Sequence, residues 1–381
     1  MPPIRDHRTL KPTDPTTDTI ALRPNFRQQG FWNPTHVFAH ERGARIHRMD
    51  LNECPYPPSP KVLAAIASAA PDLNRYPDGT CPVLTGRLSE RLDIPAAQIC
   101  WGAGSTQLLT AVAQIAVDSG QELVAPALIW RRFCGVFDVV DAALRTVPNR
   151  DDGSIDVQGL LNAIGNRTRL LLVVTPNNPT GLMLSHDELS LLAEHTPQNT
   201  LLFVDEAYFE FAAYAGGPDA LDILKHRHGP WVVTRTFSKA YALAGLRLGY
   251  ALCSSGAIAN ALRLVTSTFN LAGVAEAAAL AALDDPDYTQ MILRTTAIER
   301  ERLTTGMRAL GLSPMDSVTN FIGVDAGMDA GYVVRAMRER GIRIATFGYE
   351  AAGTCIRVST GLPEDTDAFL GALKEVLTSA G

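Results

Sequence analysis

The feature that most constrains the fold of this chain is a repeated alternation of short apolar runs with longer amphipathic segments. The apolar runs lie at 99–101, 123–125, 170–175, 201–204 and 231–233. Helical patterns separate them, for example at 106–117 and 185–194. Such alternation is typical of a sheet with parallel strands and helices between them. We therefore predict an α/β protein with a mostly parallel central sheet.

A second, smaller α/β unit is predicted in the C-terminal part of the chain. A long helical pattern over 288–310 leads into it. A chain of 381 residues is also long for a single domain. We predict an N-terminal arm over 1–50, a large domain over 51–285 and a small domain over 286–381.

Composition argues against several classes of protein. The hydrophobic fraction of 46% and the charged fraction of 19% are typical of a soluble globular enzyme. A net charge of −6 with scattered basic residues argues against a nucleic-acid partner. The longest apolar stretch, 271–283, is too short to span a membrane, and residues 1–19 lack the apolar core of a signal peptide. Six widely spaced cysteines without a CxxC pair favour a reducing cytoplasm and no metal site.

Reactive side chains follow the ends of the apolar runs, where parallel sheets bind their ligands. Lys239 offers an amine that can hold a carbonyl cofactor as a Schiff base. The hydroxyls of Thr236 and Ser238 and the guanidinium of Arg247 can hold a phosphate. Pyridoxal 5′-phosphate carries both an aldehyde and a phosphate, so this stretch favours it as the cofactor. A solvated Ser-Lys pair on the surface is the alternative for the same residues.

Three further segments offer contacts for such a cofactor. Gly104 and Ser105 precede a helix, whose N-terminal amides can cradle a phosphate, although a tight turn explains them equally well. Asp205 ends an apolar run and can pair with a protonated pyridine nitrogen, or it can simply cap a turn. Tyr208 and Asn178 can donate hydrogen bonds to an oxygen on the same ring.

Several stretches of the chain occur together, in this order, in one enzyme family. They are 51–56 (LNECPY), 75–78 (RYPD), 177–181 (NNPTG), 205–208 (DEAY), 237–240 (FSKA), 245–250 (GLRLGY) and 356–359 (IRVS). With them the chain, from about residue 50 to its end, resembles pyridoxal-phosphate-dependent aminotransferases of fold type I, most closely the histidinol-phosphate aminotransferase branch. The resemblance implies transfer of an amino group between an amino acid, or an amine similar to histidinol phosphate, and a 2-oxo acid. Lyases, decarboxylases and cyclases share this fold and stay open as alternatives.

The resemblance also implies roles for particular residues. The catalytic residues would be Lys239, which forms the Schiff base and shuttles a proton, with Asp205 and Tyr208. The cofactor contacts would come from Gly104, Ser105, Trp130, Asn178, Asp205, Tyr208, Thr236, Ser238, Lys239, Arg247 and Tyr76. Tyr76 would reach the phosphate across a homodimer interface, and Trp130 stands where the family usually stacks a tyrosine. Arg357, with Asn178, would bind the anionic group of the substrate.

The sequence says less about the identity of the substrate than about that of the cofactor. Enzymes of the histidinol-phosphate branch hold a phosphate with a second arginine shortly before the equivalent of Arg357 and with a tyrosine of the partner subunit. Here that position is Ala345, Arg343 lies two residues earlier, and no tyrosine precedes Asn52. A dianionic phosphate is best held by two or more cations. The sequence therefore favours an α-amino acid with a free carboxylate, and histidinol phosphate stays open.

Overall fold

The computed structural model describes residues 46–130, 133, 140–347 and 353–379, which all belong to one unit spanning 40–381. The arm predicted over 1–50 therefore lies almost entirely outside the described residues. The domain boundaries predicted after residues 50 and 285 stay a prediction. Within the described ranges, no helix is both long and apolar enough to cross a membrane.

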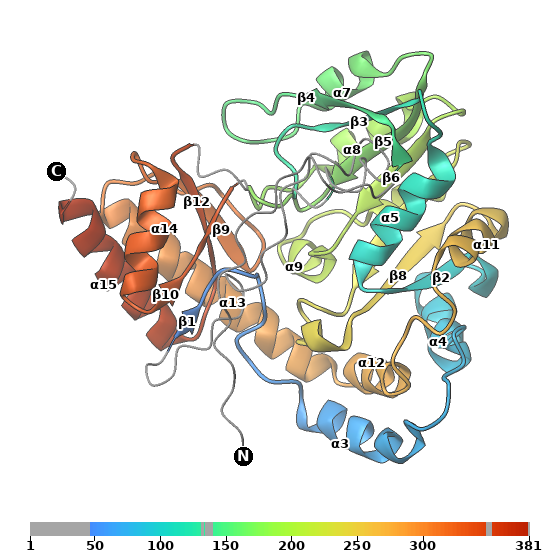
Figure 1. Cartoon of the computed structure of the whole chain (residues 1–381), viewed down its shortest axis with the longest axis horizontal. Helices are drawn as coiled ribbons and strands as arrows, with labels where there is room; N and C mark the ends of the chain where they lie inside the picture. The colour runs from blue at the N-terminus through green and yellow to red at the C-terminus, as the bar shows by residue number, and fades with distance from the viewer. Residues whose placement is uncertain (1–45, 131–132, 134–139, 348–352, 380–381) are drawn as a thin grey trace, which may run out of the picture. The chain divides into compact units, whose positions relative to one another are not determined.

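A seven-stranded sheet with the order β2-β8-β7-β6-β5-β3-β4 forms the centre of the fold (Figure 1). Its strands are β2 (Ile99–Ala103), β3 (Glu122–Pro126), β4 (Ala143–Val147), β5 (Thr168–Val174), β6 (Leu201–Asp205), β7 (Trp231–Thr236) and β8 (Leu248–Cys253). β8 runs antiparallel to both of its neighbours, and the other neighbouring strands are parallel. The predicted α/β fold with a mostly parallel sheet is confirmed.

Helices cover both faces of this sheet because its strands are apolar on both sides. In β5, Leu170, Leu172 and Val174 belong to the core shared with α5 (Ser105–Ala116) and α11 (Gly256–Val265). Leu171 and Val173 belong to the opposite core, shared with the helices α4 (Pro82–Leu92), α7 (Val157–Ala163), α8 (His186–His195), α10 (Ala220–Leu224) and α12 (Ala275–Leu283). Successive side chains of a strand point to opposite faces, so a continuous apolar run indicates burial on both.

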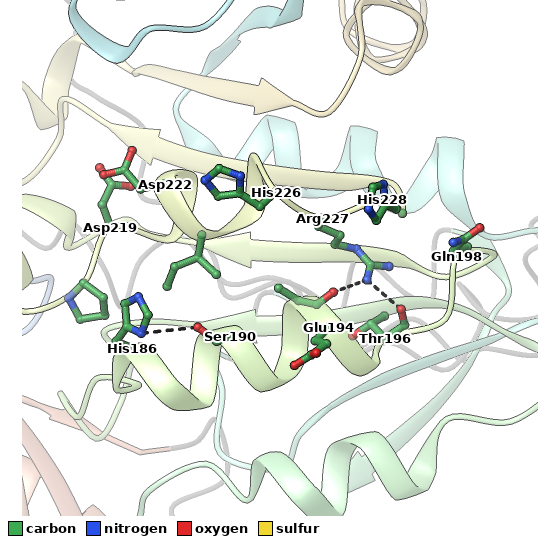
Figure 2. A pocket seen from close by; sticks show the side chains of 14 residues that line it. His186, Ser190, Glu194, Thr196, Gln198, Asp219, Asp222, His226, Arg227 and His228 are labelled. Carbon is green, nitrogen blue, oxygen red and sulfur yellow. Dashed lines mark hydrogen bonds between the residues drawn. The ribbon is translucent and has the colours of Figure 1, made fainter.

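Helix α8 shows how the sequence fixes one of these elements locally. Ser185 Oγ accepts the backbone N–H of Glu188 at 3.2 Å, and Glu188 accepts the N–H of Ser185 at 3.0 Å, so the two residues form a capping box. At the other end, the Arg227 guanidinium donates to the carbonyls of Ala193 and Thr196, both at 2.7 Å (Figure 2). Carbonyls at a helix C-terminus lack partners inside the helix, so Arg227 satisfies them from outside.

The C-terminal part of the chain forms a second, antiparallel sheet with the order β11-β12-β9. Its strands are β9 (Phe321–Asp325), β11 (Ala345–Thr346) and β12 (Cys355–Ser359), packed with α13 (Pro286–Ala309), α14 (Ala330–Glu339) and α15 (Pro363–Ser379). β1 (His47–Arg48) pairs in parallel with β10 (Ile342–Arg343). The remaining described elements are α3 (Pro60–Ala69), α9 (Phe209–Tyr214) and the short 3₁₀ helices η1 (Ala70–Asp72), η2 (Ala96–Gln98) and η3 (Ala244–Leu246). The β1–β10 pairing brings the segment after β1 beside β12, where Ser359 N donates to Met49 O at 2.8 Å.

Candidate active site

The predicted site residues follow the carboxyl ends of parallel strands of the central sheet. Gly104 follows β2, Asn178 lies shortly after β5, Asp205 ends β6 and Thr236 ends β7. β2 and β7 are both antiparallel to β8, so they run in the same direction as β5 and β6. These ends therefore meet at one edge of the sheet, which is where open α/β sheets bind ligands.

Lys239 lies three residues beyond the end of β7, with its amine turned toward the segment after β1. Its Nζ donates to the backbone carbonyl of Asn52 at 2.9 Å and lies 3.4 Å from that of Leu51. The same nitrogen is 5.7 Å from the centre of the Tyr208 ring. Burial, assisted by the positive charge of Arg357, lowers the pKa of the Lys239 amine to about 8. A lysine with a lowered pKa is a better nucleophile near neutral pH.

This lowered pKa predicts how the stability of the cofactor-free protein depends on pH. Between pH 8 and 10.5 the unfolded chain keeps a proton on Lys239 that the folded chain has lost. The free energy of unfolding therefore rises with pH across this window. We expect urea unfolding to show this rise in the wild type and to show a smaller one in Lys239→Met. Other groups titrate equally in both proteins, so parallel pH profiles would contradict the lowered pKa.

Asp205 is buried and, among the residues that the structure describes, has one side-chain hydrogen-bond partner. Thr234, its neighbour across the parallel β6–β7 pair, donates its hydroxyl to Asp205 Oδ1 at 2.9 Å. Burial raises the pKa of the Asp205 carboxyl to about 7, against the Thr234 hydrogen bond and the charge of Lys239, which lower it. The next residue, Glu206, is held separately by Arg235 Nε at 2.9 Å. Few hydrogen bonds and charges offset the cost of burying the Asp205 carboxylate. Such a carboxylate favours a cationic partner.

Tyr208, Asn178 and Arg357 form a connected group beside Lys239. Tyr208 Oη accepts hydrogen bonds from Asn52 Nδ2 at 2.9 Å and from Asn178 Nδ2 at 3.4 Å. Arg357 donates from Nη1 to Asn178 Oδ1 at 2.6 Å and from Nη2 to the Asp50 carbonyl at 2.7 Å. Its buried Nε finds no hydrogen-bond partner among the described residues. Leaving a buried donor of a cation without a partner is costly, so this group is suited to an anionic ligand.

A second group of donors gathers around the N-terminus of α5. Thr236 Oγ1 and Ser238 Oγ are 2.9 Å apart, and Arg247 Nη1 reaches Ser238 Oγ at 3.4 Å. Gly104 has φ of +71°, and a Cβ added there would lie 2.4 Å from Arg247 Nη2. Ser105 is the first residue of α5. Hydroxyls, a guanidinium and the positive end of a helix thus meet around Gly104, where a side chain would collide with Arg247. Such a group of donors is suited to binding an anion.

Two predicted residues, Tyr76 and Trp130, form ring contacts with residues outside these groups. Tyr76 is 81% exposed and stacks on Phe269, with ring centres 4.6 Å apart. Trp130 follows β3 and meets Phe133 edge to face at 6.0 Å. Within the described part of the chain, neither ring forms a hydrogen bond or ring contact with the other predicted site residues.

Asn52 and Thr234 contact the site directly but are not among the predicted site residues. Asn52 bonds both Lys239 and Tyr208, and Thr234 bonds Asp205. Asn52 belongs to one of the stretches that carried the family resemblance, but no role was assigned to it. Thr234 gave no signal of its own, since a threonine within an apolar strand is common.

The structure also locates Ala345 and Arg343, the two residues on which the substrate prediction depends. Ala345 of β11 is the cross-strand partner of Arg357, and directly opposed side chains of an antiparallel pair lie on the same face. Arg343 lies on β10 instead, where its Nη2 forms an ion pair with Asp50 Oδ2 at 3.0 Å. Arg343 therefore does not take the position of Ala345.

A separate surface groove of about 770 Å³ lies between α8 and α10 and contains none of the predicted site residues. Figure 2 shows its lining, which includes His186, His226, His228 and Arg227. No group of three histidine, cysteine or acidic side chains within the described ranges could hold a metal ion.

Comparison with known proteins relates most of the chain to one family. Residues 45–373 match the family described as aminotransferase class I and II. Histidinol-phosphate aminotransferase 2 of Pseudomonas aeruginosa is 41% identical over 347 residues, which cover 90% of this chain and 93% of that protein. The aromatic amino acid aminotransferase of Thermobifida fusca is 36% identical over 329 residues, covering 86% of this chain and 89% of that protein.

A solved structure gives the same relation. The crystal structure of histidinol-phosphate aminotransferase from Sinorhizobium meliloti in complex with pyridoxal 5′-phosphate superposes with a TM-score of 0.87 at 33% identity. The match covers 96% of this chain and 100% of that one.

Proposed function

Because the chain belongs to the aminotransferase class I and II family, we propose that it transfers an amino group between an α-amino acid and a 2-oxo acid, with pyridoxal 5′-phosphate bound around Lys239. One observation carries the proposal. The Lys239 amine, the buried Asp205 carboxylate and the anion site around Arg247 all lie at the carboxyl edge of the central sheet. The relatives named above are all aminotransferases, which favours transamination over the lyase, decarboxylase and cyclase alternatives.

The residues at the site fit the three chemical groups of this cofactor. An aldehyde needs an amine of lowered pKa, which Lys239 supplies. A pyridine nitrogen that carries a proton needs a buried anion, and the raised pKa of Asp205 reflects a carboxylate without a cationic neighbour close enough to offset its burial. A phosphate needs donors without competing acid groups, which Thr236, Ser238 and Arg247 provide.

These residues divide the work of transamination among them. Bound pyridoxal 5′-phosphate supplies a protonated conjugated ring that takes up the electron pair left when an amino acid loses its α-proton. Asp205 keeps the ring nitrogen protonated, and Thr234 holds that carboxylate in place. Lys239 Nζ removes the α-proton as a general base, a role that contributes about 10²–10⁴-fold to the rate. Arg357 and Asn178 bind and orient the carboxylate of the substrate.

For the substrate we favour an α-amino acid with a free carboxylate. Arg357 can bind a carboxylate, whereas a phosphate dianion calls for a second cation beside it. Ala345 stands opposite Arg357, and Arg343 is engaged with Asp50. Histidinol phosphate is the second candidate, because the Pseudomonas aeruginosa relative and the Sinorhizobium meliloti structure carry its name.

A substrate panel tests this preference. We expect half-transamination by the wild type to be faster with α-amino acids, aromatic ones included, than with histidinol phosphate. Ala345→Arg adds a cation on the face of Arg357 and should raise kcat/KM for histidinol phosphate about 10–100-fold, the effect of one charge-assisted hydrogen bond. Thr346→Arg, one residue along on the opposite face, is the matched control. A wild type that strongly prefers histidinol phosphate would overturn the proposed substrate.

Membership of this family supports a proposal about the assembly of the enzyme. We infer a homodimer in which Tyr76, exposed in the single chain, reaches the phosphate of the neighbouring site. The five described cysteines are all free thiols, which supports a reducing cytoplasm. Trp130, which follows the carboxyl end of β3, is proposed to stack on the cofactor ring.

A further inference from the structure

We propose that Asn52 is a positioning residue, which aims the hydroxyl proton of Tyr208 at the ring oxygen of bound pyridoxal 5′-phosphate. The inference rests on the proposed function and gives a role to a residue that the sequence left unassigned. It is carried by the backbone of Asn52, by the orientation of two amides and by the hydrogen-bonding capacity of the phenol.

Asn52 is held by its surroundings in an uncommon conformation. Its φ is +54°, in the left-handed region that asparagine adopts more readily than most residues, and its exposed fraction is 2%. Its N–H donates to Ser359 Oγ at 2.9 Å, and its carbonyl accepts from Lys239 at 2.9 Å and from Asn320 at 3.0 Å. Glycine would adopt this backbone at a lower energetic cost, so the amide is the feature that distinguishes asparagine here.

The amide of Asn52 has a fixed orientation. Ser359 Oγ already accepts the Asn52 N–H, so its one hydroxyl proton is available for Asn52 Oδ1, which lies 2.9 Å away. The Nδ2 group of Asn52 must then face Tyr208 Oη, also at 2.9 Å.

The amide of Asn178 is fixed in a similar way. A guanidinium can only donate, and Arg357 Nη1 lies 2.6 Å from Asn178 Oδ1. The Nδ2 group of Asn178 therefore faces Tyr208 Oη, at 3.4 Å. Both amides thus donate to the same phenol oxygen.

This arrangement leaves the Tyr208 hydroxyl one hydrogen bond to make, and it must donate. A phenol oxygen accepts two hydrogen bonds and donates one, and the two amides fill both acceptor positions. Burial raises the pKa of Tyr208, so the proton stays on the oxygen. No acceptor for that proton is found among the described residues. A negatively charged oxygen on the cofactor ring is an acceptor of the right kind, and Lys239 Nζ lies 5.7 Å from the Tyr208 ring.

The test uses the holoenzyme loaded with pyridoxal 5′-phosphate and follows the pH at which its visible absorbance band changes. Asn52→Gly keeps the positive φ and the carbonyl that Lys239 contacts, but it removes the amide. A hydrogen bond to the ring oxygen stabilises the deprotonated form of the bound cofactor. When Asn52 no longer orients the Tyr208 hydroxyl, this hydrogen bond weakens, and the pKa read from the band should rise by about 0.5–1 unit. In a Tyr208→Phe background, the same change should cause no further shift.

Asn52→Asp is the second variant, in case the glycine weakens folding. Aspartate has the same size and also tolerates the left-handed region, but it offers Tyr208 an acceptor instead of a donor. The hydroxyl would then turn toward residue 52, and the pKa of the band should rise more than in Asn52→Gly. An unchanged pKa in both variants, or an equal shift from Asn52→Gly with and without the Tyr208 hydroxyl, would overturn the role of Asn52. A wild type that shows no visible band after loading would instead refute the proposed cofactor site.

Discussion

Replacing Lys239 with alanine is expected to abolish transamination and the visible absorbance of the bound cofactor. The change removes the only amine placed at this site in the described part of the chain. Loss of the general base alone lowers the rate by about 10²–10⁴-fold, and loss of the covalent anchor adds to this. The measurements are steady-state transamination and the absorbance spectrum after loading with pyridoxal 5′-phosphate.

Two further variants test whether the loss of activity is due to the missing amine of Lys239. Lys239→Met keeps most of the length of the side chain without the amine and should be as inactive as Lys239→Ala. Lys374→Ala removes an exposed lysine of α15, far from the chemistry in sequence, and should keep wild-type activity. Native turnover in either variant of Lys239 would show that this lysine has been wrongly assigned.

Asp205→Asn is expected to lower kcat/KM about 10²–10⁴-fold. Breaking a buried ion pair by removing one partner costs about 3–5 kcal/mol, and here the partner left behind would be the protonated ring nitrogen. The asparagine has nearly the same shape and can keep the hydrogen bond from Thr234. The affinity for pyridoxal 5′-phosphate should fall as well, which equilibrium titration of the cofactor-free protein can measure.

Measuring the free energy of unfolding of Asp205→Asn shows whether its lost activity comes from the missing carboxylate or from a destabilised fold. Burial raises the pKa of Asp205 to about 7 from 3.8, so the carboxyl destabilises the cofactor-free fold increasingly as pH rises through that window. Above pH 7 the cofactor-free Asp205→Asn protein should therefore be at least as stable as the wild type. Asp187→Asn, at an exposed position in the first turn of α8, is the matched control. Wild-type kcat/KM in Asp205→Asn would contradict the proposed role of the carboxylate.

Much of the fold was predictable because its signals are local. The strands β5, β6 and β7 each contain an uninterrupted apolar run, since both of their faces are buried, and the capping box of α8 lies within four residues. Two strands of the central sheet were missed. β4 is an edge strand with mostly exposed or half-buried residues, so it lacks an apolar run. β8 begins inside the stretch 245–250, whose glycines and arginine were interpreted only as ligand contacts.

The sequence alone therefore predicts which reactive side chains lie at the ends of the strands. Asn178, Asp205 and Lys239 each follow or end a strand that the apolar pattern locates, and sheets of this kind gather such ends at one edge. These residues indicate the cofactor, and the family resemblance adds transamination as the expected reaction.

Only the tertiary structure decided how these side chains are held. Asn52 is 156 residues from Tyr208 in the chain, and no local pattern predicts that β1 pairs with β10 and carries Asn52 to that hydroxyl. The register of β11 and β12 likewise places Ala345, and not Arg343, opposite Arg357. Hydrogen bonds of this kind depend on the packing of distant segments, whereas strand and helix patterns depend on neighbouring residues. The sequence thus indicates a pyridoxal-phosphate aminotransferase, and the long-range pairing sets the orientation of its catalytic groups and the shape of its substrate site.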